Sequence, residues 1–224
     1  MKNLLITGIG GKVGKYVYEL ASDYSFNVVC GIDKQKLLDI ECPVYSGFDE
    51  IRENLDVIVD FSSDTLCREA CLYALKNNCA FLTGTTALTE KTLKAIEGAS
   101  TEIAVCKASN YSKAVLTMEK ISKIARESLP DFDAQIIEVH HSQKKDKPSG
   151  TAKRIGELTG IKEIHSIRGG DTPGIHTVIM SGNGEEMVIT HRSYNKSVFA
   201  RGALQAAQKL LTKAPGLYAA ENLL

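Results

Sequence analysis

The sequence has no excess of charge of either sign, because 27 basic residues are balanced by 27 acidic residues. Proteins that bind nucleic-acid phosphates usually carry a basic surface, so we expect no nucleic-acid partner. The chain also has no apolar run long enough to span a bilayer, and we expect no membrane partner. Its first residues lack the features of a signal peptide, which favours a cytoplasmic location.

The six cysteines form no Cys-x-x-Cys pair, and all lie in the first half of the chain, which contains no histidine. A metal site built from these cysteines is therefore not expected. Cys67 and Cys71 stand four residues apart in an expected helix and could lie close together. The pattern favours buried, reduced thiols of the kind found in cytoplasmic proteins.

The remaining composition is that of an ordinary globular protein, with 43% hydrophobic and 24% charged residues in a chain of 224. This length suits one large domain or two modest ones. The first half alternates short apolar strands with amphipathic helices, which predicts a Rossmann-like, doubly wound parallel sheet. The expected strands cover residues 3–7, 27–32, 57–61, 80–83 and 102–106, and the expected helices cover 15–23, 65–77 and 89–97.

The pattern changes after Ser112. Helices are expected at 113–128, 152–159 and 199–211, and strands at 136–139, 163–168, 175–181 and 186–193. Gly-Asn-Gly at residues 182–184 predicts a hairpin turn between the last two strands. These elements predict a second, α+β domain with an open mixed sheet, followed by a short tail over residues 213–224.

A glycine-rich turn joins the first expected strand to the first expected helix, with Gly8, Gly11 and Gly14 spaced three residues apart. In a dinucleotide-binding fold, such glycines permit the tight turn, the approach of a pyrophosphate and close packing of the helix. Asp33 ends the second strand, where its carboxylate can accept hydrogen bonds from ribose hydroxyls, which favours NADH. Lys12 and Lys34 could instead bind a 2′-phosphate or be plain surface lysines, so we expect use of both NADH and NADPH.

Two further loops follow strands of the same predicted sheet, Gly84-Thr85-Thr86 and Ala108-Ser109-Asn110-Tyr111. Ligands bind at the carboxyl ends of parallel strands. Each loop could therefore line the nicotinamide end of a dinucleotide, or each could be an ordinary turn.

The most informative stretch is residues 138–152, Glu-Val-His-His-Ser-Gln-Lys-Lys-Asp-Lys-Pro-Ser-Gly-Thr-Ala. The Ser-Gly-Thr turn at 149–151 opens an expected helix, whose N-terminal N–H groups suit an anion such as a carboxylate. His141 and Lys144 can add charge or donors there, and His140 can move a proton near neutral pH. Each residue alone is more often structural, but together they predict a site for reducing a small carboxylated substrate.

This stretch resembles the signature of the 4-hydroxy-tetrahydrodipicolinate reductases, also called dihydrodipicolinate reductases. The similarity runs along nearly the whole chain, through segments 8–14, 56–62, 84–86, 109–112, 168–176, 199–203 and 216–218, together with His191 and the final Leu223-Leu224. Asn195-Lys196 stands where Ser-Arg is common in the family, and lysine keeps the charge without the forked geometry of arginine.

The resemblance implies a cytoplasmic enzyme of lysine and diaminopimelate biosynthesis. It would reduce 4-hydroxy-tetrahydrodipicolinate, with loss of water, to tetrahydrodipicolinate by means of NADH or NADPH. His140 and Lys144 would be the catalytic proton donors. The implied substrate-binding residues are His141, Ser149, Gly150 and Thr151, and the implied cofactor-binding residues are Gly8, Ile9, Gly10, Gly11, Lys12, Val13, Asp33, Lys34, Gly84, Thr85, Thr86, Ala108, Ser109, Asn110 and Tyr111.

The resemblance also implies how the chain is divided and assembled. Residues 1–112 and 203–224 would form the dinucleotide-binding domain, and residues 113–202 the substrate-binding and oligomerisation domain. The two crossings between these domains would act as a hinge. The sheet of the second domain would assemble a homotetramer.

Three other functions remain open at the level of the sequence. A related Rossmann dehydrogenase acting on another small dicarboxylate would share the glycine turn but has no reason to carry the whole 138–152 pattern. A non-catalytic dinucleotide sensor would not need the proton donors. A metalloenzyme could use His140, His141, His176 or His191, but no His-x-x-x-His spacing supports it.

Overall fold

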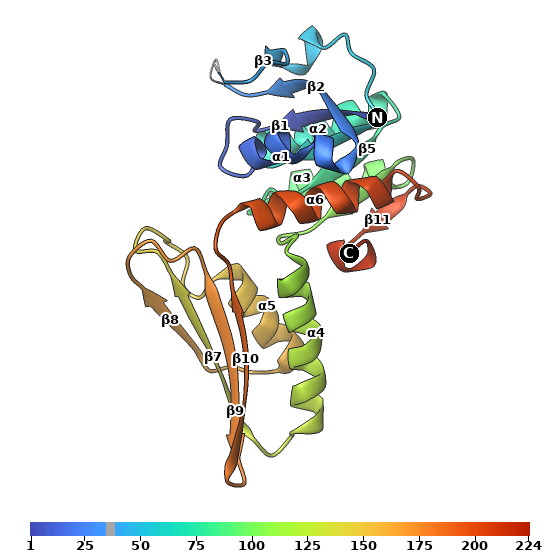
Figure 1. The fold of residues 1–224 in the computed structure, drawn as a ribbon. Helices are drawn as coiled ribbons and strands as arrows, with labels where there is room; N and C mark the ends of the chain where they lie inside the picture. The colour runs from blue at the N-terminus through green and yellow to red at the C-terminus, as the bar shows by residue number, and fades with distance from the viewer. Residues whose placement is uncertain (35–38) are drawn as a thin grey trace. The chain divides into compact units, whose positions relative to one another are not determined.

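A computed structural model describes residues 1–34 and 39–224 of the chain. The described residues form two compact units (Figure 1). Unit 1 comprises Met1–Tyr111 and Ser197–Leu224, and unit 2 comprises Ser112–Lys196. The sequence placed the second crossing at residue 203, a few residues too late. The structure assigns all of helix α6 (Ser197–Leu210) to unit 1, because the helix packs on the sheet of that unit.

Unit 1 is built on a sheet of seven parallel strands in the order β11-β6-β5-β4-β1-β2-β3. The strands are β1 (Lys2–Thr7), β2 (Phe26–Ile32), β3 (Val44–Tyr45), β4 (Val57–Asp60), β5 (Ala80–Thr83), β6 (Ala104–Lys107) and β11 (Gly216–Tyr218). The central strands are almost continuous apolar runs, because a parallel sheet is buried on both faces.

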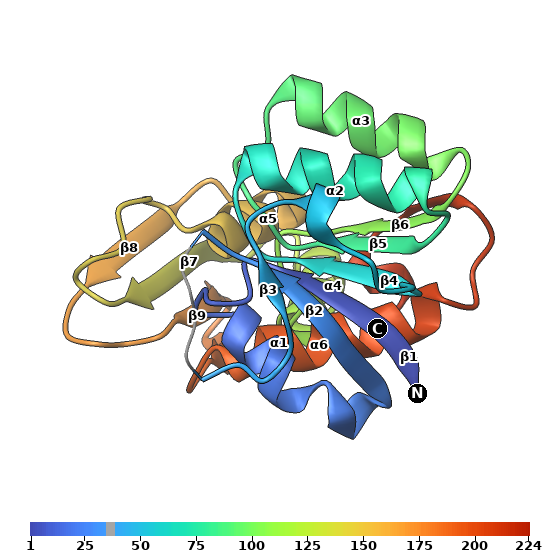
Figure 2. The ribbon, with the colours of Figure 1, turned by 90° about the horizontal axis from the view of Figure 1, so that it is seen from above.

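Helices cover both faces of this sheet (Figure 2). α1 (Gly14–Leu20) and α6 pack together on one face, and α2 (Asp64–Lys76) and α3 (Glu90–Ser100) pack together on the other. Short 3₁₀ helices occur at η1 (Ser22–Tyr24), η2 (Phe48–Glu50) and η3 (Ala220–Asn222). The doubly wound α/β architecture expected from the sequence is confirmed.

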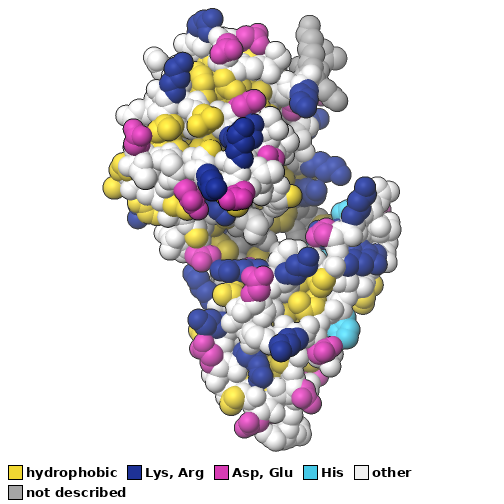
Figure 3. All heavy atoms as spheres, turned by 180° about the vertical axis from the view of Figure 1, so that it is seen from behind, with side chains coloured by type: hydrophobic (Ala, Val, Ile, Leu, Met, Phe, Trp, Pro, Cys, Tyr) yellow, Lys and Arg dark blue, Asp and Glu magenta, His cyan; other side chains and the backbone are white. Residues whose placement is uncertain are grey.

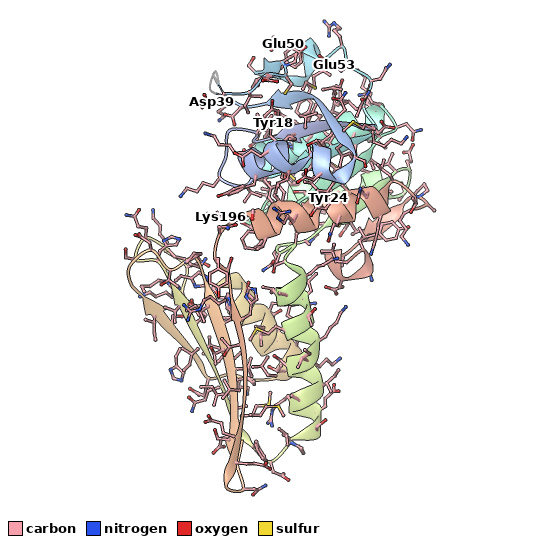
Figure 4. The ribbon with its side chains drawn as sticks, in the orientation of Figure 1. Tyr18, Tyr24, Asp39, Glu50, Glu53 and Lys196 are labelled. Carbon is pink, nitrogen blue, oxygen red and sulfur yellow. The ribbon has the colours of Figure 1, made fainter. Side chains whose placement is uncertain are left out.

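Two hydrogen bonds accepted by tyrosines link peripheral segments of unit 1 to its helices. The Tyr18 hydroxyl on α1 accepts a hydrogen bond from the Glu41 backbone N–H at 3.0 Å. Gln208 of α6 donates to the Tyr24 carbonyl at 2.7 Å. Figure 4 labels both tyrosines, together with Lys196, the last residue of unit 2. These bonds connect the segment after β2, and the turn after α1, to the helical layer.

Unit 2 contains a four-stranded sheet in the order β10-β9-β7-β8. Its elements are α4 (Lys113–Ser128), β7 (Asp133–His140), α5 (Gly150–Thr159), β8 (Ile164–Arg168), β9 (Ile175–Gly182) and β10 (Glu185–Arg192). β7 and β8 are parallel, whereas the other neighbouring pairs are antiparallel, so the sheet is mixed as predicted. The expected hairpin turn follows β9, with φ positive at Asn183 and Gly184.

The two faces of the unit 2 sheet differ. α4 and α5 lie against one face (Figure 1) and enclose a core that includes Ile136, Ile155 and Val178. In the described part of unit 2, no helix covers the opposite face. On that face Ile167 is 52% exposed and Val188 is 51% exposed.

The surface and the cysteines agree with the composition. Acidic and basic side chains are interspersed on the face shown in Figure 3, as a net charge of zero suggests. All six cysteines are free thiols, and only Cys42 is not fully buried. No helix among residues 1–34 and 39–224 has both the length and the apolar character needed to cross a membrane.

Candidate active site

The glycine turn directly follows β1 at the carboxyl edge of the parallel sheet. Gly8 has a φ of +73°, and a Cβ atom there would lie 2.4 Å from the Phe61 carbonyl oxygen. A Cβ atom on Gly14 would lie 2.0 Å from the Gly8 carbonyl oxygen. Both distances are far below van der Waals contact, so a larger residue would force the turn open. A turn this tight lets backbone N–H groups approach a pyrophosphate at the start of a helix.

The acidic residue after β2 lies beside this turn. Asp33 Oδ2 accepts a hydrogen bond from the Gly10 backbone N–H at 3.0 Å. Lys12 and Lys34 both have exposed side chains. The structure therefore brings together the glycine turn and the carboxylate that the sequence suggested for a dinucleotide.

The remaining residues expected to bind a cofactor form two groups, one buried and one at least partly exposed. Ile9, Thr85 and Tyr111 are buried, and the Tyr111 hydroxyl donates to the Thr83 carbonyl at 2.7 Å. Ile9 and Tyr111 therefore present almost no surface to a ligand. At least partly exposed at the carboxyl edge are Gly8, Gly10, Gly11, Lys12, Val13, Gly84, Thr86, Ala108, Ser109 and Asn110. The Ala108 N–H donates to the Thr83 carbonyl at 3.2 Å, which joins the loops after β5 and β6.

A buried ion pair lies on the face of the unit 2 sheet that α4 and α5 cover. Along β7, Ile136, Glu138 and His140 alternate onto the face that the helices cover. The Arg168 guanidinium donates from Nη1 to Glu138 Oε2 at 2.8 Å and from Nη2 to Glu138 Oε1 at 2.7 Å. Burial opposes ionisation of this carboxyl, but hydrogen bonds from Arg168, Ser166 and His140 outweigh it and lower the pKa of Glu138 to about 2.

His140 is held by this carboxylate. Its Nδ1 lies 2.5 Å from Glu138 Oε2, and the residue is only 8% exposed. Burial lowers the pKa of His140 below its ordinary value, although the Glu138 carboxylate acts in the opposite direction. An ionised Glu138 requires a hydrogen on Nδ1, which leaves Nε2 to exchange protons. A Cβ atom on Gly174 would lie 3.0 Å from Nε2, so glycine there leaves space beside that nitrogen.

Arg168 also orders the loop that carries Lys144. Its Nε donates to the Lys144 carbonyl at 3.2 Å, and its Nη2 donates to the Asp146 carbonyl at 2.6 Å. The Lys144 N–H donates to the His141 carbonyl at 3.1 Å, and Lys144 Nζ lies 2.8 Å from Asp146 Oδ1. One guanidinium therefore connects the buried carboxylate of β7 with the loop of the second expected proton donor.

Helix α5 begins beside the same carboxylate. Ser149 is its N-cap: the hydroxyl accepts from the Ala152 N–H at 3.2 Å and lies 3.0 Å from His176 Nε2. The Ser149 N–H donates to Glu138 Oε1 at 3.2 Å. Burial lowers the pKa of His176 to about 4, and the neighbouring charges of His140 add to this effect. The Ser149 hydroxyl is thus engaged within the protein.

The other expected substrate-binding residues lie around this helix start. Gly150 is exposed, and Thr151 and His141 are half-buried. The His141 N–H donates to the Thr172 carbonyl at 2.8 Å, which fixes the backbone after β7. The structure therefore groups His140, His141, Lys144 and the 149–151 turn within unit 2, at the end of β7 and the start of α5.

The sequence analysis gave no role to Glu138 and Arg168 of this cluster, and it named His176 only as a possible metal ligand. Glu138 could have been found, because a carboxylate two residues before His140 on a strand must share its face. Arg168 and His176 could not, because they lie opposite His140 and Glu138 only through the pairing of β7 with β8 and β9. His176 also packs edge-to-face on His140, with ring centroids 5.1 Å apart.

The histidines do not form a recognisable metal site in the part of the chain that the structure describes. No group of three or more histidine, cysteine, aspartate or glutamate side chains there is arranged to hold a metal ion. His176 and His191 are cross-strand neighbours on β9 and β10, and burial lowers the pKa of both. Of these two residues, His176 is hydrogen-bonded, because its Nε2 lies 3.0 Å from the Ser149 hydroxyl.

Comparison with known proteins gives the same family for both units. The family model described as dihydrodipicolinate reductase, N-terminus, matches residues 2–111, and the model for the C-terminus matches residues 114–224. The 4-hydroxy-tetrahydrodipicolinate reductase of Caldanaerobacter subterraneus subsp. tengcongensis is 36% identical over 100% of this chain and 98% of its own length. That of Thermosipho africanus is 37% identical over 98% of this chain and 96% of its own length.

A solved structure has the same fold throughout. The dipicolinate-bound dihydrodipicolinate reductase of Paenisporosarcina sp. TG-14 superposes with a TM-score of 0.82, at 23% identity and full coverage of both chains. At that identity the likeness concerns the fold. It extends through both the parallel sheet of unit 1 and the mixed sheet of unit 2.

The parallel sheet with its glycine turn, and the second unit with its carboxylate–histidine pair, define a two-unit oxidoreductase of the Rossmann type. More particularly, the chain belongs to the family of 4-hydroxy-tetrahydrodipicolinate reductases, or dihydrodipicolinate reductases. This family reduces 4-hydroxy-tetrahydrodipicolinate to tetrahydrodipicolinate with NADH or NADPH, in the biosynthesis of lysine and diaminopimelate.

Proposed function

We propose that His140 and Lys144 of unit 2 supply the protons for this reduction, while unit 1 binds NADH or NADPH. The observation that carries the proposal is the buried Glu138 carboxylate, which bonds at once to His140 Nδ1, to Arg168 and to the N–H of Ser149, the N-cap of α5. This one group fixes the orientation of the histidine relative to the helix start. Such an arrangement is typical of an oriented acid–base group beside an anion site.

His140 is proposed to protonate the carbon next to the one that is reduced. Addition of a hydride to one carbon of the ring leaves negative charge on its neighbour, which an acid must protonate. Glu138 supports the imidazolium form through Nδ1, and Nε2 delivers the proton. Because burial lowers the pKa of His140, its imidazolium is a stronger acid than an exposed one.

Lys144 is proposed as the second proton donor, to the oxygen that leaves as water. Its ammonium charge helps to lower the pKa of His140, which places the two groups within electrostatic reach. Its turn is held by Arg168, and its ion pair with Asp146 keeps the ammonium at the loop. The overall reaction is balanced when one hydride and one net proton enter the substrate and one water leaves.

The substrate carboxylates are proposed to bind around the start of α5, through His141, Gly150 and Thr151. The first turn of a helix presents N–H groups that have no acceptor within the helix, and its dipole favours an anion. Ser149 contributes by capping the helix, because its hydroxyl is already bonded to Ala152 N and His176. A half-buried His141 can add a donor beside the same turn.

The glycine turn of unit 1 suits a dinucleotide, because its backbone is packed too closely to admit a Cβ atom at Gly8 or Gly14. When bound, the reduced dinucleotide supplies the hydride. We propose that residues 8–13 face its pyrophosphate, that Asp33 accepts from the ribose, and that Lys34 and Lys12 meet a 2′-phosphate when one is present. Loops 84–86 and 108–111 are proposed to line the nicotinamide end, because they leave neighbouring strands of the same edge.

We further propose a homotetramer that forms through the open face of the unit 2 sheet, and a cytoplasmic location. The assembly is supported by apolar side chains on that face, such as Ile167 and Val188, which are about half exposed in the single chain. Sedimentation of the wild-type protein and of Val188→Lys tests it, because a charge on that face should lower the oligomer size. The location is supported by the place of the family in amino-acid biosynthesis.

The experiment that tests the function uses substrate made in situ from pyruvate and aspartate semialdehyde by the preceding synthase. Oxidation of NADH and NADPH is followed at 340 nm. We expect oxidation that depends on both the synthase and this protein. No oxidation, despite measurable binding of the nucleotides, would contradict the proposed reaction.

A further inference from the structure

A buried carboxylate in unit 1 takes no part in the mechanism above. Asp60 is the last residue of β4 and is 0% exposed. It accepts hydrogen bonds from the hydroxyls of Thr7 at 2.6 Å, Thr83 at 2.7 Å and Thr85 at 2.7 Å, and also from Ser62. Four hydroxyl groups from three different parts of the chain therefore meet at one carboxylate.

These groups form a polar row across the end of an otherwise apolar sheet. Thr7, Asp60 and Thr83 occupy the last positions of β1, β4 and β5, and they are in register with one another. The strand positions before them are occupied by buried apolar residues such as Ile6, Val59 and Leu82. The side chains of the sheet thus change from apolar to polar at the last position of each of these strands, directly before the loops.

Each residue of the row is followed by a loop at the carboxyl edge of the sheet, and the loops after β1 and β5 belong to the proposed dinucleotide site. Gly8 follows Thr7, and Gly84 follows Thr83. The loops also interlock, because Thr85 Oγ1 accepts from the Ser62 N–H at 2.8 Å. Phe61 lies between the glycines: a Cβ on Gly84 would lie 2.1 Å from its ring, and one on Gly8 would lie 2.4 Å from its carbonyl oxygen.

Stability alone does not require this row. Burying a carboxylate and several hydroxyls is costly unless all of them are hydrogen-bonded, and valine at the ends of these strands would avoid that cost. A satisfied buried network, by contrast, allows only one arrangement of the groups that it joins. Here the joined groups are the starting points of three loops, so the network fixes the geometry of the loops.

We propose that Asp60 is a positioning residue of the reductase, which sets its affinity for the dinucleotide by holding the loops after β1, β4 and β5 in one arrangement. The inference rests on the proposed binding of the dinucleotide at this edge. Asp60 acts through Thr7, Thr83 and Thr85 and does not itself need to touch the cofactor. Its effect should therefore appear in the binding of NADH and NADPH, and not in the chemistry of unit 2.

The test compares Asp60→Asn with Asp56→Asn. Asp56 precedes the same strand at its opposite end, where it accepts from Lys2 Nζ at 2.8 Å and from the Asn3 N–H at 2.7 Å. Both substitutions remove one carboxylate that is bonded to β1, so Asp56→Asn controls for the loss of such a carboxylate away from the carboxyl edge of the sheet. The dissociation constants of NADH and NADPH are measured by fluorescence titration, and kcat and both KM values by the coupled assay.

We expect Asp60→Asn to raise the dissociation constant and the KM of both nucleotides about tenfold or more, because hydrogen bonds to a charged group are worth about that factor. The KM of the dicarboxylate should stay unchanged. Asp56→Asn should leave nucleotide affinity unchanged. If Asp60→Asn fails to fold, the near-isosteric Thr7→Val and Thr83→Val each remove one hydroxyl, and together they should weaken nucleotide binding in the folded protein.

Two further measurements separate this inference from the proposed function. If the wild-type protein binds neither nucleotide, the proposed function is wrong and the inference fails with it. If the wild-type protein binds and Asp33→Ala weakens binding, the site is supported. Wild-type affinity in folded Asp60→Asn, or in the double valine variant, would then overturn the positioning role alone.

Discussion

Glu138 Oε2 lies 2.5 Å from His140 Nδ1, and both oxygens of the same carboxylate are bonded to the guanidinium of Arg168. The carboxylate is fully buried, and its hydrogen bonds to Arg168, Ser166 and His140 lower its pKa to about 2, so it is ionised near neutral pH. An ionised partner on Nδ1 fixes one tautomer of the imidazole and directs Nε2 outward. This pair supports the proposed role of His140 in proton transfer.

Glu138→Gln should lower both turnover and stability. The amide cannot stabilise an imidazolium, so we expect kcat to fall at least about tenfold. It also leaves Arg168 without its buried counter-charge, which should cost about 3–5 kcal/mol in the free energy of unfolding. Steady-state kinetics measure kcat, and urea unfolding measures the free energy of unfolding. Glu163→Gln, at an exposed position before β8, is the matched control and should change neither.

Acid should destabilise the protein through His176 before it affects the carboxylates. Burial lowers the pKa of His176 from 6.5 to about 4 in the folded state. The unfolded chain therefore binds more protons between these values, and stability falls as the pH falls from 6.5 to about 4. The shift corresponds to roughly 3 kcal/mol. Glu138, with its pKa lowered from 4.5 to about 2, adds a loss of stability only below pH 4.5.

His176→Gln tests this account, because glutamine can still bond to Ser149 but does not titrate. The free energy of unfolding is measured in urea at pH 7 and at pH 4.5. The wild-type protein should lose more stability between the two values than the variant. Burial also lowers the pKa of His140, so the variant should keep part of the dependence. Equal losses in the two proteins would remove His176 from the explanation.

The thiols should be unreactive in the native protein. Burial raises the pKa of Cys30, Cys71 and Cys79 to about 12 and that of Cys106 to about 11. The thiolate is the reactive form, so these groups are both inaccessible and protonated at pH 8. An assay with Ellman's reagent should show rapid reaction of at most one thiol, Cys42, which is partly exposed. The other five should react only after denaturation.

Asp33 should discriminate between the two nucleotides. Its carboxylate is bonded to the Gly10 N–H and lies where ribose hydroxyls are expected. Asp33→Ala should weaken NADH binding about tenfold and NADPH binding less, because NADPH carries a phosphate in place of one hydroxyl. Lys34→Ala should instead weaken NADPH binding more than NADH binding. Equal changes in the two dissociation constants, measured by fluorescence titration, would argue against contact with the ribose.

The sequence predicted the large elements because their signals are local. The apolar runs of β1, β4 and β5 and the glycine turn at 8–14 each mark a strand or a junction without reference to the rest of the chain. β3 and β11 were not predicted, because stretches of two and three residues show no periodicity. β11 exists because Gly216–Tyr218 pairs with β6, and that pairing is a long-range contact.

The candidate site was predicted in part for the same reason. His140, His141, Lys144 and the 149–151 turn lie close together in the chain, so the sequence pattern could group them. Arg168 joins them only because β8 pairs with β7 in the register that places it opposite His140. The polar row of Asp60 likewise depends on the register of three strands, which no local pattern reveals.

The account depends most directly on His140 as the proton donor. The decisive measurement is NADH oxidation by His140→Ala with substrate generated in situ, alongside NADH binding by the same preparation. We predict that turnover falls about a hundredfold or more, the usual contribution of a general acid, while the dissociation constant of NADH stays at the wild-type value. Turnover equal to that of the wild-type protein would contradict the account and remove His140 from the mechanism.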